Sequence, residues 1–370
     1  MDTTDFDFHL PDELIAQEPP VVRGDSRLLV LHRASGQIEH TIFSRVADYL
    51  RCGDLVVLNN TKVFPARLLG HRLPSGGAVE CLLIRQLPTP QRPTPNANDG
   101  VGGGGLGVGD SAVWEALMHP GQKLKPGAKV VFDGSGVRLH GEVVGRHFHG
   151  RRTIRLWAER GIDVAGAIDR IGHVPLPPYI KREDRPADRE RYQTVYARER
   201  GSIAAPTAGL HVTDAVLDAL ASRGVERTEL TLHVGYGTFK PIRTDQVEDH
   251  VVEPETCVVS TDAAAALTRA RSEGRRIIAV GTTTVRALES LTVETDGRIK
   301  PLVGEAQIFI RPGHEFRSVH GLITNFHLPR SSLLVLVAAF AGRERMLDTY
   351  REAVARAYRF YSYGDAMLIL

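Results

Sequence analysis

Two clusters of small and polar residues have the composition of a ligand-binding site. One runs from Gly201 to His211 with the sequence GSIAAPTAGLH, and the other runs from His233 to Phe239 with the sequence HVGYGTF. Glycine allows a backbone to approach a ligand closely, and histidine and threonine side chains supply directed polar groups. We therefore expect a site here rather than a packed core.

A third candidate is the segment Gly281–Ser290, GTTTVRALES, which follows an apolar run at 276–280. A strand, a glycine, three threonines and a helix would place unpaired N–H groups and hydroxyls together, and these suit a carboxylate or a phosphate. The segment lacks the lysine of a phosphate-binding loop. A helix that is capped by a threonine and holds no ligand is the alternative interpretation.

Two further polar groups follow apolar runs. Asn325 and His327 point to the same face if 322–329 is extended, because side chains alternate along a strand. The tetrad Asn59–Lys62 follows the apolar run 54–58, and it predicts either a ligand-binding loop or an ordinary turn, since asparagine and threonine favour both.

The elements around the first two clusters can be predicted from their capping residues. Thr213 is a suitable N-cap, and Gly224 stands where a helix C-terminal cap belongs, so a helix is expected between them. The run 229–233 then predicts a strand that ends at His233. Ligands of open α/β sheets bind beyond the carboxyl ends of strands, which places His233 and its loop where chemistry is usual.

The region from about Gly70 to Arg151 has a different pattern, with short strands separated by glycine and proline. Such a pattern predicts an inserted β-barrel or sandwich. The expected strands are 78–84, 112–118, 128–132, 137–144 and 153–156. We predict an α/β domain from 1–69 and 152–370, an inserted domain at 70–151, and a flexible, glycine-rich loop at 86–110. The match to GxGxxG in that loop lacks the flanking strand and helix that a dinucleotide site needs.

The remaining α/β elements are predicted from apolar periodicity and caps. Strands are expected at 26–31, 54–59, 276–280 and 307–311, and helices at 262–273, from near Ser331 to Gly342, and at 343–358.

Composition limits the protein class. The 46 basic and 44 acidic residues leave a net charge of +2, so any nucleic-acid surface must be local. The three cysteines have no paired spacing that would indicate zinc or a redox dithiol. The N-terminal segment lacks the apolar core of a signal peptide, and the apolar run 333–340 is too short to span a bilayer. We expect a cytoplasmic protein without a membrane segment or a bound metal.

Several motifs together resemble the S-adenosylmethionine:tRNA ribosyltransferase-isomerase family of queuosine biosynthesis. The resemblance covers nearly the whole chain in order and is weakest between 70 and 160. It rests on DFDFHLPDELIAQEP at 5–19, NNTKVFPARL at 59–68, YQTVYA at 192–197, APTAGLH at 205–211, LHVGYGTFKP at 232–241, GTTTVRALES at 281–290, GLITNFHLPRSSLL at 321–334 and YRFYSYGDAM at 358–367.

The resemblance implies a fold and a reaction. The fold is a large α/β domain with a smaller inserted antiparallel β-barrel. The family transfers and isomerises the ribosyl part of S-adenosylmethionine onto the aminomethyl group of a 7-deazaguanine at the tRNA wobble position. Epoxyqueuosine forms, and adenine and methionine leave. S-adenosylmethionine is a co-substrate, tRNA is the partner, and no separate cofactor is implied. We expect a monomer.

The implied chemistry needs a base next to a sulfonium and a proton donor for departing adenine, and histidine suits both roles. Four histidines are candidates for acid–base catalysis: His211, His233, His250 and His327. For each of them, a purely structural imidazole is the alternative. Arg286 and the threonines at 282–284 are candidates for binding the methionine carboxylate. Tyr192 and Tyr236 are candidates for stacking on a base. The implied substrate-binding set is Tyr192, Thr207, Gly209, Gly235, Tyr236, Gly237, Thr282, Thr283, Thr284, Arg286, Asn325 and Arg67, with Lys62 as a further phosphate contact.

Two positions depart from the family pattern. Glu253 stands where the family usually has histidine, and His320 stands where it usually has aspartate. The two changes could compensate each other if both lie in the pocket. Otherwise they indicate a relative with an altered substrate or reduced activity. The alternative functions are a related S-adenosylmethionine-dependent transferase with a different acceptor and a catalytically silent RNA-binding relative.

Overall fold

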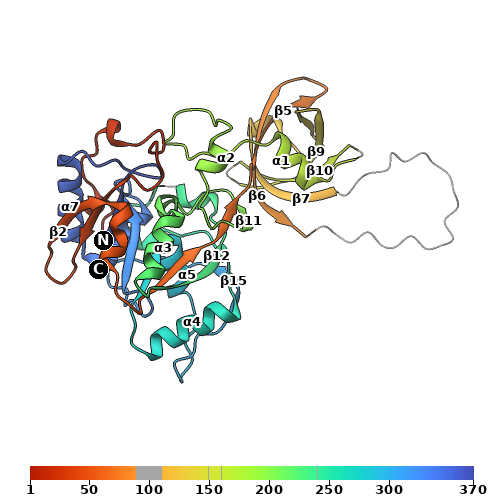
Figure 1. Ribbon diagram of the computed structural model, residues 1–370. Helices are drawn as coiled ribbons and strands as arrows, with labels where there is room; N and C mark the ends of the chain where they lie inside the picture. The colour runs from red at the N-terminus through yellow and green to blue at the C-terminus, as the bar shows by residue number, and fades with distance from the viewer. Residues whose placement is uncertain (89–110, 149, 160, 240) are drawn as a thin grey trace. The chain divides into compact units, whose positions relative to one another are not determined.

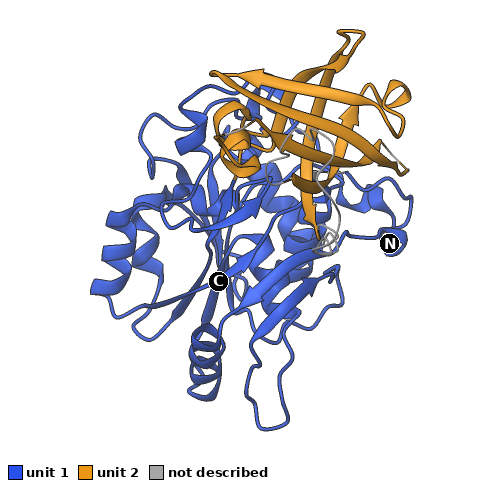
Figure 2. Cartoon of the chain, turned by 90° about the vertical axis from the view of Figure 1, so that its right-hand side faces the viewer, with its two compact units in different colours: residues 1–63, 176–370 blue, residues 64–175 orange. Residues whose placement is uncertain are grey.

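The computed structural model describes residues 1–88, 111–148, 150–159, 161–239 and 241–370 (Figure 1). The chain divides into two compact units, one formed by 1–63 with 176–370 and the other by 64–175 (Figure 2). The second unit is longer at both ends than the predicted 70–151. It includes all of strand β5 (Arg67–Leu73), strand β10 (Arg151–Ala158) and helix α1 (Val164–Ile171), which packs on the barrel strands.

Among its described residues, the second unit is a closed barrel of six antiparallel strands, which confirms the predicted fold class. The strand order around the barrel is β10, β7 (Ser111–His119), β6 (Ala78–Leu87), β5, β8 (Lys129–Gly134) and β9 (Val137–Arg146). Strand β5 was not predicted, because Gly70, His71 and Arg72 interrupt its apolar pattern. Gly70 is needed there, since a Cβ at this position would lie 2.2 Å from the Val131 carbonyl oxygen.

The described part of the first unit contains a nine-stranded mixed sheet. Its strand order is β15 (Leu302–Ala306), β13 (Glu255–Val259), β12 (Glu226–Leu232), β3 (Leu55–Asn59), β14 (Ile277–Val280), β16 (Gly321–Asn325), β17 (Ala366–Ile369), β1 (Arg27–Leu31) and β2 (Ile38–Ile42). Strands β12, β3, β14 and β16 are parallel neighbours, so their carboxyl ends share one edge. The neighbouring strand β17 runs antiparallel to β16.

The two faces of this sheet bury different residues of the same strands. In β3, Leu55 and Val57 belong to one core, and Val56 and Leu58 belong to the other. Both faces are therefore covered, and the central parallel strands β3 and β14 consist almost entirely of apolar residues. The first core includes residues of α4 (Thr261–Ser272), α5 (Thr282–Glu289), α6 (Ser332–Ala341) and α7 (Arg343–Ala355), and the second includes residues of α3 (Asp214–Ser222) and the 3₁₀ segment η3 (Phe43–Tyr49).

Short elements complete the unit. Strand β4 (Thr61–Val63) pairs with β11 (Glu199–Ser202), and α2 (Asp188–Arg191) is a single turn. The 3₁₀ turns η5 (Thr207–His211) and η6 (Tyr236–Phe239) carry the two predicted clusters. None of the helices in the described ranges has the combination of length and apolarity that a membrane crossing requires.

Local signals predicted most elements correctly. The Thr213 hydroxyl accepts a hydrogen bond from the Val216 N–H at the start of α3, and Gly224 has φ +73° after its end. The strand predicted at 307–311 is wrong, because the edge strand β15 pairs earlier, at 302–306. The predicted loop at 86–110 begins two residues too early, since β6 extends to Leu87, and 89–110 lies outside the described residues.

We predict that Gly70→Ala destabilises the barrel by about 1–3 kcal/mol, because the added methyl overlaps backbone and the Phe132 ring. Gly134→Ala is the control, since its Cβ would meet only Ile171 at ordinary contact distance, and its effect should stay within about 0.5 kcal/mol. The chain's two tryptophans, Trp114 and Trp157, lie in the barrel unit, so denaturant unfolding followed by their fluorescence measures this unit. Equal stability of the two variants would contradict the close approach.

Candidate functional site

A cavity lies at the end of the large sheet where the parallel strands terminate, and its lining is mostly apolar with a few polar groups. It is small, about 40 Å³, and it lies beyond the carboxyl ends of β12, β14 and β16. The lining residues are Tyr179, Ala204, Ala205, Pro206, Thr207, Ala208, Val234, Gly281, Thr282, Thr283, Thr324, Asn325, His327, Leu333, Tyr361 and Ser362. The structure thus brings the Gly201–His211 cluster, the threonine segment and the Asn325–His327 run to one place.

The Asn325 side chain connects three segments at this cavity. Its Oδ1 accepts a hydrogen bond from the Thr207 hydroxyl at 3.0 Å, and its Nδ2 donates to the Tyr361 carbonyl at 3.2 Å. The same Nδ2 lies 2.9 Å from His211 Nε2. Asn325 is 1% exposed, so these bonds satisfy an amide that would be costly to bury alone.

His211 is held behind Asn325 and does not line the cavity. Because Asn325 Nδ2 can only donate, His211 Nε2 must accept, and the proton on Nδ1 is donated to the Ser26 hydroxyl at 2.9 Å. Both ring nitrogens are therefore used. Burial lowers the pKa of His211 to about 4, which keeps the ring neutral at pH 7. This ring orients Asn325, and its predicted acid–base role stays a prediction.

His327 is the imidazole, among the four predicted ones, that lines the cavity. Its Nε2 lies 3.0 Å from the Thr324 hydroxyl, and its backbone N–H donates to the Tyr350 hydroxyl. The side chain is 5% exposed, and burial lowers its pKa to about 3. The ring is therefore neutral and free of an ionic partner among the described residues, which is the form that accepts a proton or a hydrogen bond.

The three threonines at the start of α5 differ in their surroundings. Thr282 and Thr283 line the cavity, and the Thr283 hydroxyl is buried without a hydrogen-bond partner among the described residues. Thr284 instead donates to the Val280 carbonyl at 2.6 Å, at the end of β14. Gly281, with φ +94°, turns the chain from β14 into α5. Thr283 is thus the hydroxyl that a bound group would satisfy.

Arg286 is engaged within the protein. Its Nη1 donates to Glu255 Oε2 at 2.6 Å, its Nε donates to the Ile308 carbonyl, and Glu255 Oε1 accepts from the Gly235 N–H. The Arg286 and Glu255 side chains are 11% and 4% exposed. The Arg286 Nη2 is buried without a hydrogen-bond partner among the described residues, so the binding of a substrate carboxylate by Arg286 stays a prediction. Its structural role is to hold the Gly235 loop.

The other two predicted histidines lie outside the cavity lining. His233 Nδ1 lies 2.8 Å from the Thr61 hydroxyl, and its ring packs so closely on Gly201 that a Cβ there would lie 2.6 Å from the ring. The half-buried His250 ring packs edge-on against Phe309, at 5.1 Å between centroids. Burial lowers the pKa of both rings.

Packing explains several of the remaining predicted residues. Tyr192 is fully buried and offers no ring face to a base in this structure, so its stacking role stays a prediction. Gly209 is required by Tyr196, whose hydroxyl would lie 2.2 Å from a Cβ at this position. Tyr236 is partly exposed, and its stacking role stays a prediction. Gly237 lies against the Glu253 side chain.

The two predicted phosphate contacts also lie outside this lining. Arg67 belongs to the barrel unit and pairs with Glu80 at 2.7 Å, whereas Lys62 is exposed on β4. The side chains of Asn59 and Asn60 bond to β12, through the Leu232 backbone and the Thr231 hydroxyl, as expected for a structural turn.

Sequence reasoning missed the aromatic wall of the cavity. The rings of Tyr179 and Tyr361 lie 3.8 Å apart between centroids, and the Tyr179 hydroxyl lies 2.5 Å from the Ser362 hydroxyl. Tyr361 has φ +73°, an uncommon conformation for a bulky residue. It stands in the quoted motif YRFYSYGDAM, which could have indicated it. Tyr179 follows a proline-rich run without a comparable signal.

The two departures from the family pattern are far apart in the sheet. Glu253 contacts Gly237 in the loop beyond the carboxyl end of β12. His320 Nδ1 accepts a hydrogen bond from Ile277, the first residue of β14, and therefore lies at the opposite edge of the sheet. The two changes therefore do not compensate each other, and because neither residue lines the cavity they leave its lining unchanged. Across the described ranges, no group of three or more histidine, cysteine or acidic side chains could hold a metal ion.

We predict that His211 makes stability depend on pH. Because its folded pKa of about 4 lies below the reference value of 6.5, the unfolded chain binds more protons between these values, and stability is lost as the pH falls. From pH 7 to 5 this group should cost about 2 kcal/mol. Urea unfolding of wild type and His211→Asn at both pH values measures this. The variant should lose about 2 kcal/mol less, and an unchanged pH dependence would contradict the assignment.

Comparison with known proteins finds relatives that match this chain over its full length. The chain matches the family described as Queuosine biosynthesis protein over residues 3–369. It is 49% identical over 370 residues to the S-adenosylmethionine:tRNA ribosyltransferase-isomerase of Symbiobacterium thermophilum and 47% identical to that of Syntrophotalea carbinolica, with all of each chain covered. It also resembles the crystal structure of S-adenosylmethionine tRNA ribosyltransferase from Thermotoga maritima, with 37% identity, a TM-score of 0.52, and 99% of this chain and 100% of that chain covered. The chain belongs to the queuosine biosynthesis protein family.

Proposed function

We propose that this protein is an S-adenosylmethionine:tRNA ribosyltransferase-isomerase. It transfers and isomerises the ribosyl part of S-adenosylmethionine onto the aminomethyl group of 7-aminomethyl-7-deazaguanine at the tRNA wobble position. Epoxyqueuosine forms, and adenine and methionine are released. The observation that carries this conclusion is the end-to-end match to relatives with that enzyme name. We also propose that it acts as a cytoplasmic monomer that needs no metal or additional cofactor.

The cavity offers suitable chemistry for the sulfonium nucleoside. Tyr179 and Tyr361 supply aromatic faces of the kind that stack on adenine, and the Thr283 hydroxyl at the start of α5 suits a ribose hydroxyl or the methionine carboxylate. The present volume of about 40 Å³ holds only a water molecule or two. Binding therefore requires the tyrosine wall to move, and both tyrosines are only half-buried.

His327 is our candidate for the acid–base group. It is the predicted imidazole that lines the cavity, and this position supports the role. A pKa of about 3 makes the ring a weak base in the empty cavity, so the role requires the bound substrate to raise that pKa. The Thr324 hydroxyl fixes the orientation of the ring. Asn325 lies on the same wall, and its amide is held by Thr207 and His211, so it is preorganised to hydrogen-bond a substrate.

Adenine release tests both the reaction and this role. With S-adenosylmethionine, tRNA that carries the precursor base and EDTA, the wild type should release one adenine and one methionine per modified tRNA. His327→Asn should lower kcat by at least about 100-fold, as loss of an acid–base group does. His250→Asn, the control outside the cavity lining, should stay within about threefold.

Other outcomes identify the alternatives. Turnover only with another acceptor would support a transferase of different specificity, and tRNA binding without adenine release would support a silent RNA-binding relative. A methylated product would contradict the proposed reaction. Equal effects of the His327→Asn and His250→Asn substitutions would contradict the proposed role of His327.

A pair of neighbouring threonines tests the binding mode. We predict that Thr283→Val raises the KM for S-adenosylmethionine roughly tenfold, because the cavity loses its unpaired hydroxyl while the side-chain shape is kept. Thr284→Val removes a hydroxyl that bonds to the Val280 carbonyl at the end of β14, away from the cavity lining, and its KM should change by less than about twofold. Initial rates of adenine release measure both. Similar KM values in the two variants would show that the substrate does not use Thr283.

A further inference from the structure

One end of the barrel concentrates positive charge. The segments 116–132 and 143–158 contain no aspartate or glutamate, yet they carry seven basic residues, including three of the chain's seven lysines. These residues are Lys123, Lys125, Lys129, Arg146, Arg151, Arg152 and Arg155. Arg151 and Arg155 pair with Glu115 and Glu142, which leaves the three lysines, Arg146 and Arg152 as the source of the positive potential. The chain as a whole has a net charge of only +2, so this is a local feature. A local basic surface is the electrostatic signature of a nucleic-acid contact.

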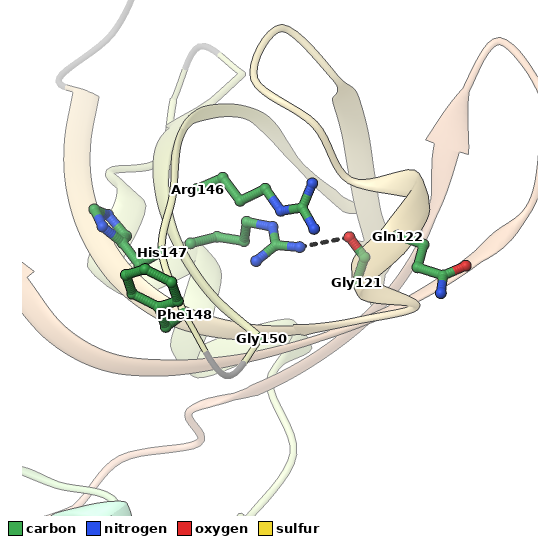
Figure 3. A pocket seen from close by; sticks show the side chains of 7 residues that line it. Gly121, Gln122, Arg146, His147, Phe148 and Gly150 are labelled. Atoms are coloured by element: carbon green, nitrogen blue, oxygen red, sulfur yellow. Dashed lines mark hydrogen bonds between the residues drawn. The ribbon is translucent and has the colours of Figure 1, made fainter.

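The barrel topology brings the two segments together around a cavity. Strands β8 and β9 are antiparallel neighbours, and the Gly127 N–H donates to the Val143 carbonyl. The cavity has a volume of about 540 Å³ (Figure 3). Its lining consists of Gly121, Gln122, Arg146, His147, Phe148, Gly150 and Arg152. This volume is in the range of pockets that bind a ligand as large as a nucleotide.

A buried guanidinium forms part of the cavity wall. Arg152 is 2% exposed, and it donates to the carbonyls of Leu124 at 2.8 Å, Arg151 at 2.7 Å and Gly121 at 2.5 Å. Burial, followed by the charge of Arg146, lowers the pKa of Arg152. Within the described ranges neither arginine pairs with a carboxylate. Two neighbouring cations without a counter-ion make the cavity favourable for an anion.

An exposed aromatic ring lies beside these cations. Phe148 is 88% exposed, which is unusual for a large apolar side chain. Figure 3 shows Phe148 and His147 side by side at one rim, while the Arg146 side chain extends toward Gly121. His147 Nε2 lies 2.8 Å from the Thr153 hydroxyl. An aromatic ring next to arginines is the arrangement with which proteins stack bases and hold the backbone of single-stranded nucleic acid.

We propose that this end of the barrel binds the sugar–phosphate backbone of the tRNA substrate. Arg146 contacts a phosphate, Phe148 stacks on an unpaired base, and Arg152 adds positive potential while it fixes the wall from Gly121 to Leu124. Lys123 and Lys125, both exposed, extend the attraction along the rim. The inference deepens the proposed function, on which it relies for the identity of the RNA. An acidic peptide is the competing occupant, but it would not require the exposed ring.

Equilibrium binding of fluorescent tRNA to the full chain tests the contact without relying on turnover. Arg146→Glu should weaken binding roughly tenfold or more and reduce the slope of log affinity against log salt by about 1. Phe148→Ala should weaken binding by at least about fivefold, the lower range for one stacked base. Arg138→Glu is the matched control. It lies on the same strand, about 26 Å away at 3.3 Å per residue, and pairs with Glu159.

The results separate this inference from the proposed function. Arg138→Glu should bind tRNA within about twofold of wild type, and tryptophan fluorescence should show that all variants unfold at the same denaturant concentration. A raised KM for tRNA with unchanged kcat and KM for S-adenosylmethionine supports the contact. The proposed contact would be overturned if Arg146→Glu and Arg138→Glu bound tRNA with the same affinity and the same salt slope. It would also be overturned if polyglutamate displaced the tRNA. Wild-type binding without adenine release would overturn the function and leave the contact in place.

Discussion

The buried side-chain amide of Asn325 is the interaction on which the cavity depends. It accepts from Thr207, donates to the Tyr361 carbonyl and donates to His211, whose other nitrogen is tied to Ser26. A planar amide can satisfy these partners only in one orientation, so the network couples the end of β16 to η5 and to the chain before β17. Loss of one member would leave the others buried and unpaired, which explains why so small a cavity has defined walls.

Burial also decides the chemical state of the site. Both His211 and His327 are neutral at physiological pH because the enclosed edge of the sheet penalises a charged ring. The charges that are present near the sheet edge are paired, as Arg286 is with Glu255. A sulfonium substrate would thus enter a cavity of hydroxyls, an amide and a neutral imidazole, in which its own positive charge is not opposed by a protonated histidine.

The barrel has a different design. Its core is closed by six antiparallel strands, and it requires glycine where strand β5 crosses the backbone of β8. The cationic side chains gather at one rim, next to an exposed phenylalanine. The two units therefore present two kinds of surface: one encloses small polar groups, and the other displays charge and an aromatic face to solvent.

The sequence by itself determined the family, the fold class and most elements whose signals are local. The Thr213 cap, the apolar strands β3 and β14, and the glycine before α5 all act within a few residues, so they could be predicted without tertiary contacts. Only the tertiary structure decided which histidine lines the cavity. His211 and His233 bond to residues more than 100 positions away in the chain, whereas His327 bonds to Thr324 in the turn that follows β16. The sequence around each histidine does not reveal these partners. The tertiary structure also decided that Arg286 pairs with Glu255 and that the rings of Tyr179 and Tyr361 are in contact. Each pair forms only when distant strands and loops meet at one end of the sheet.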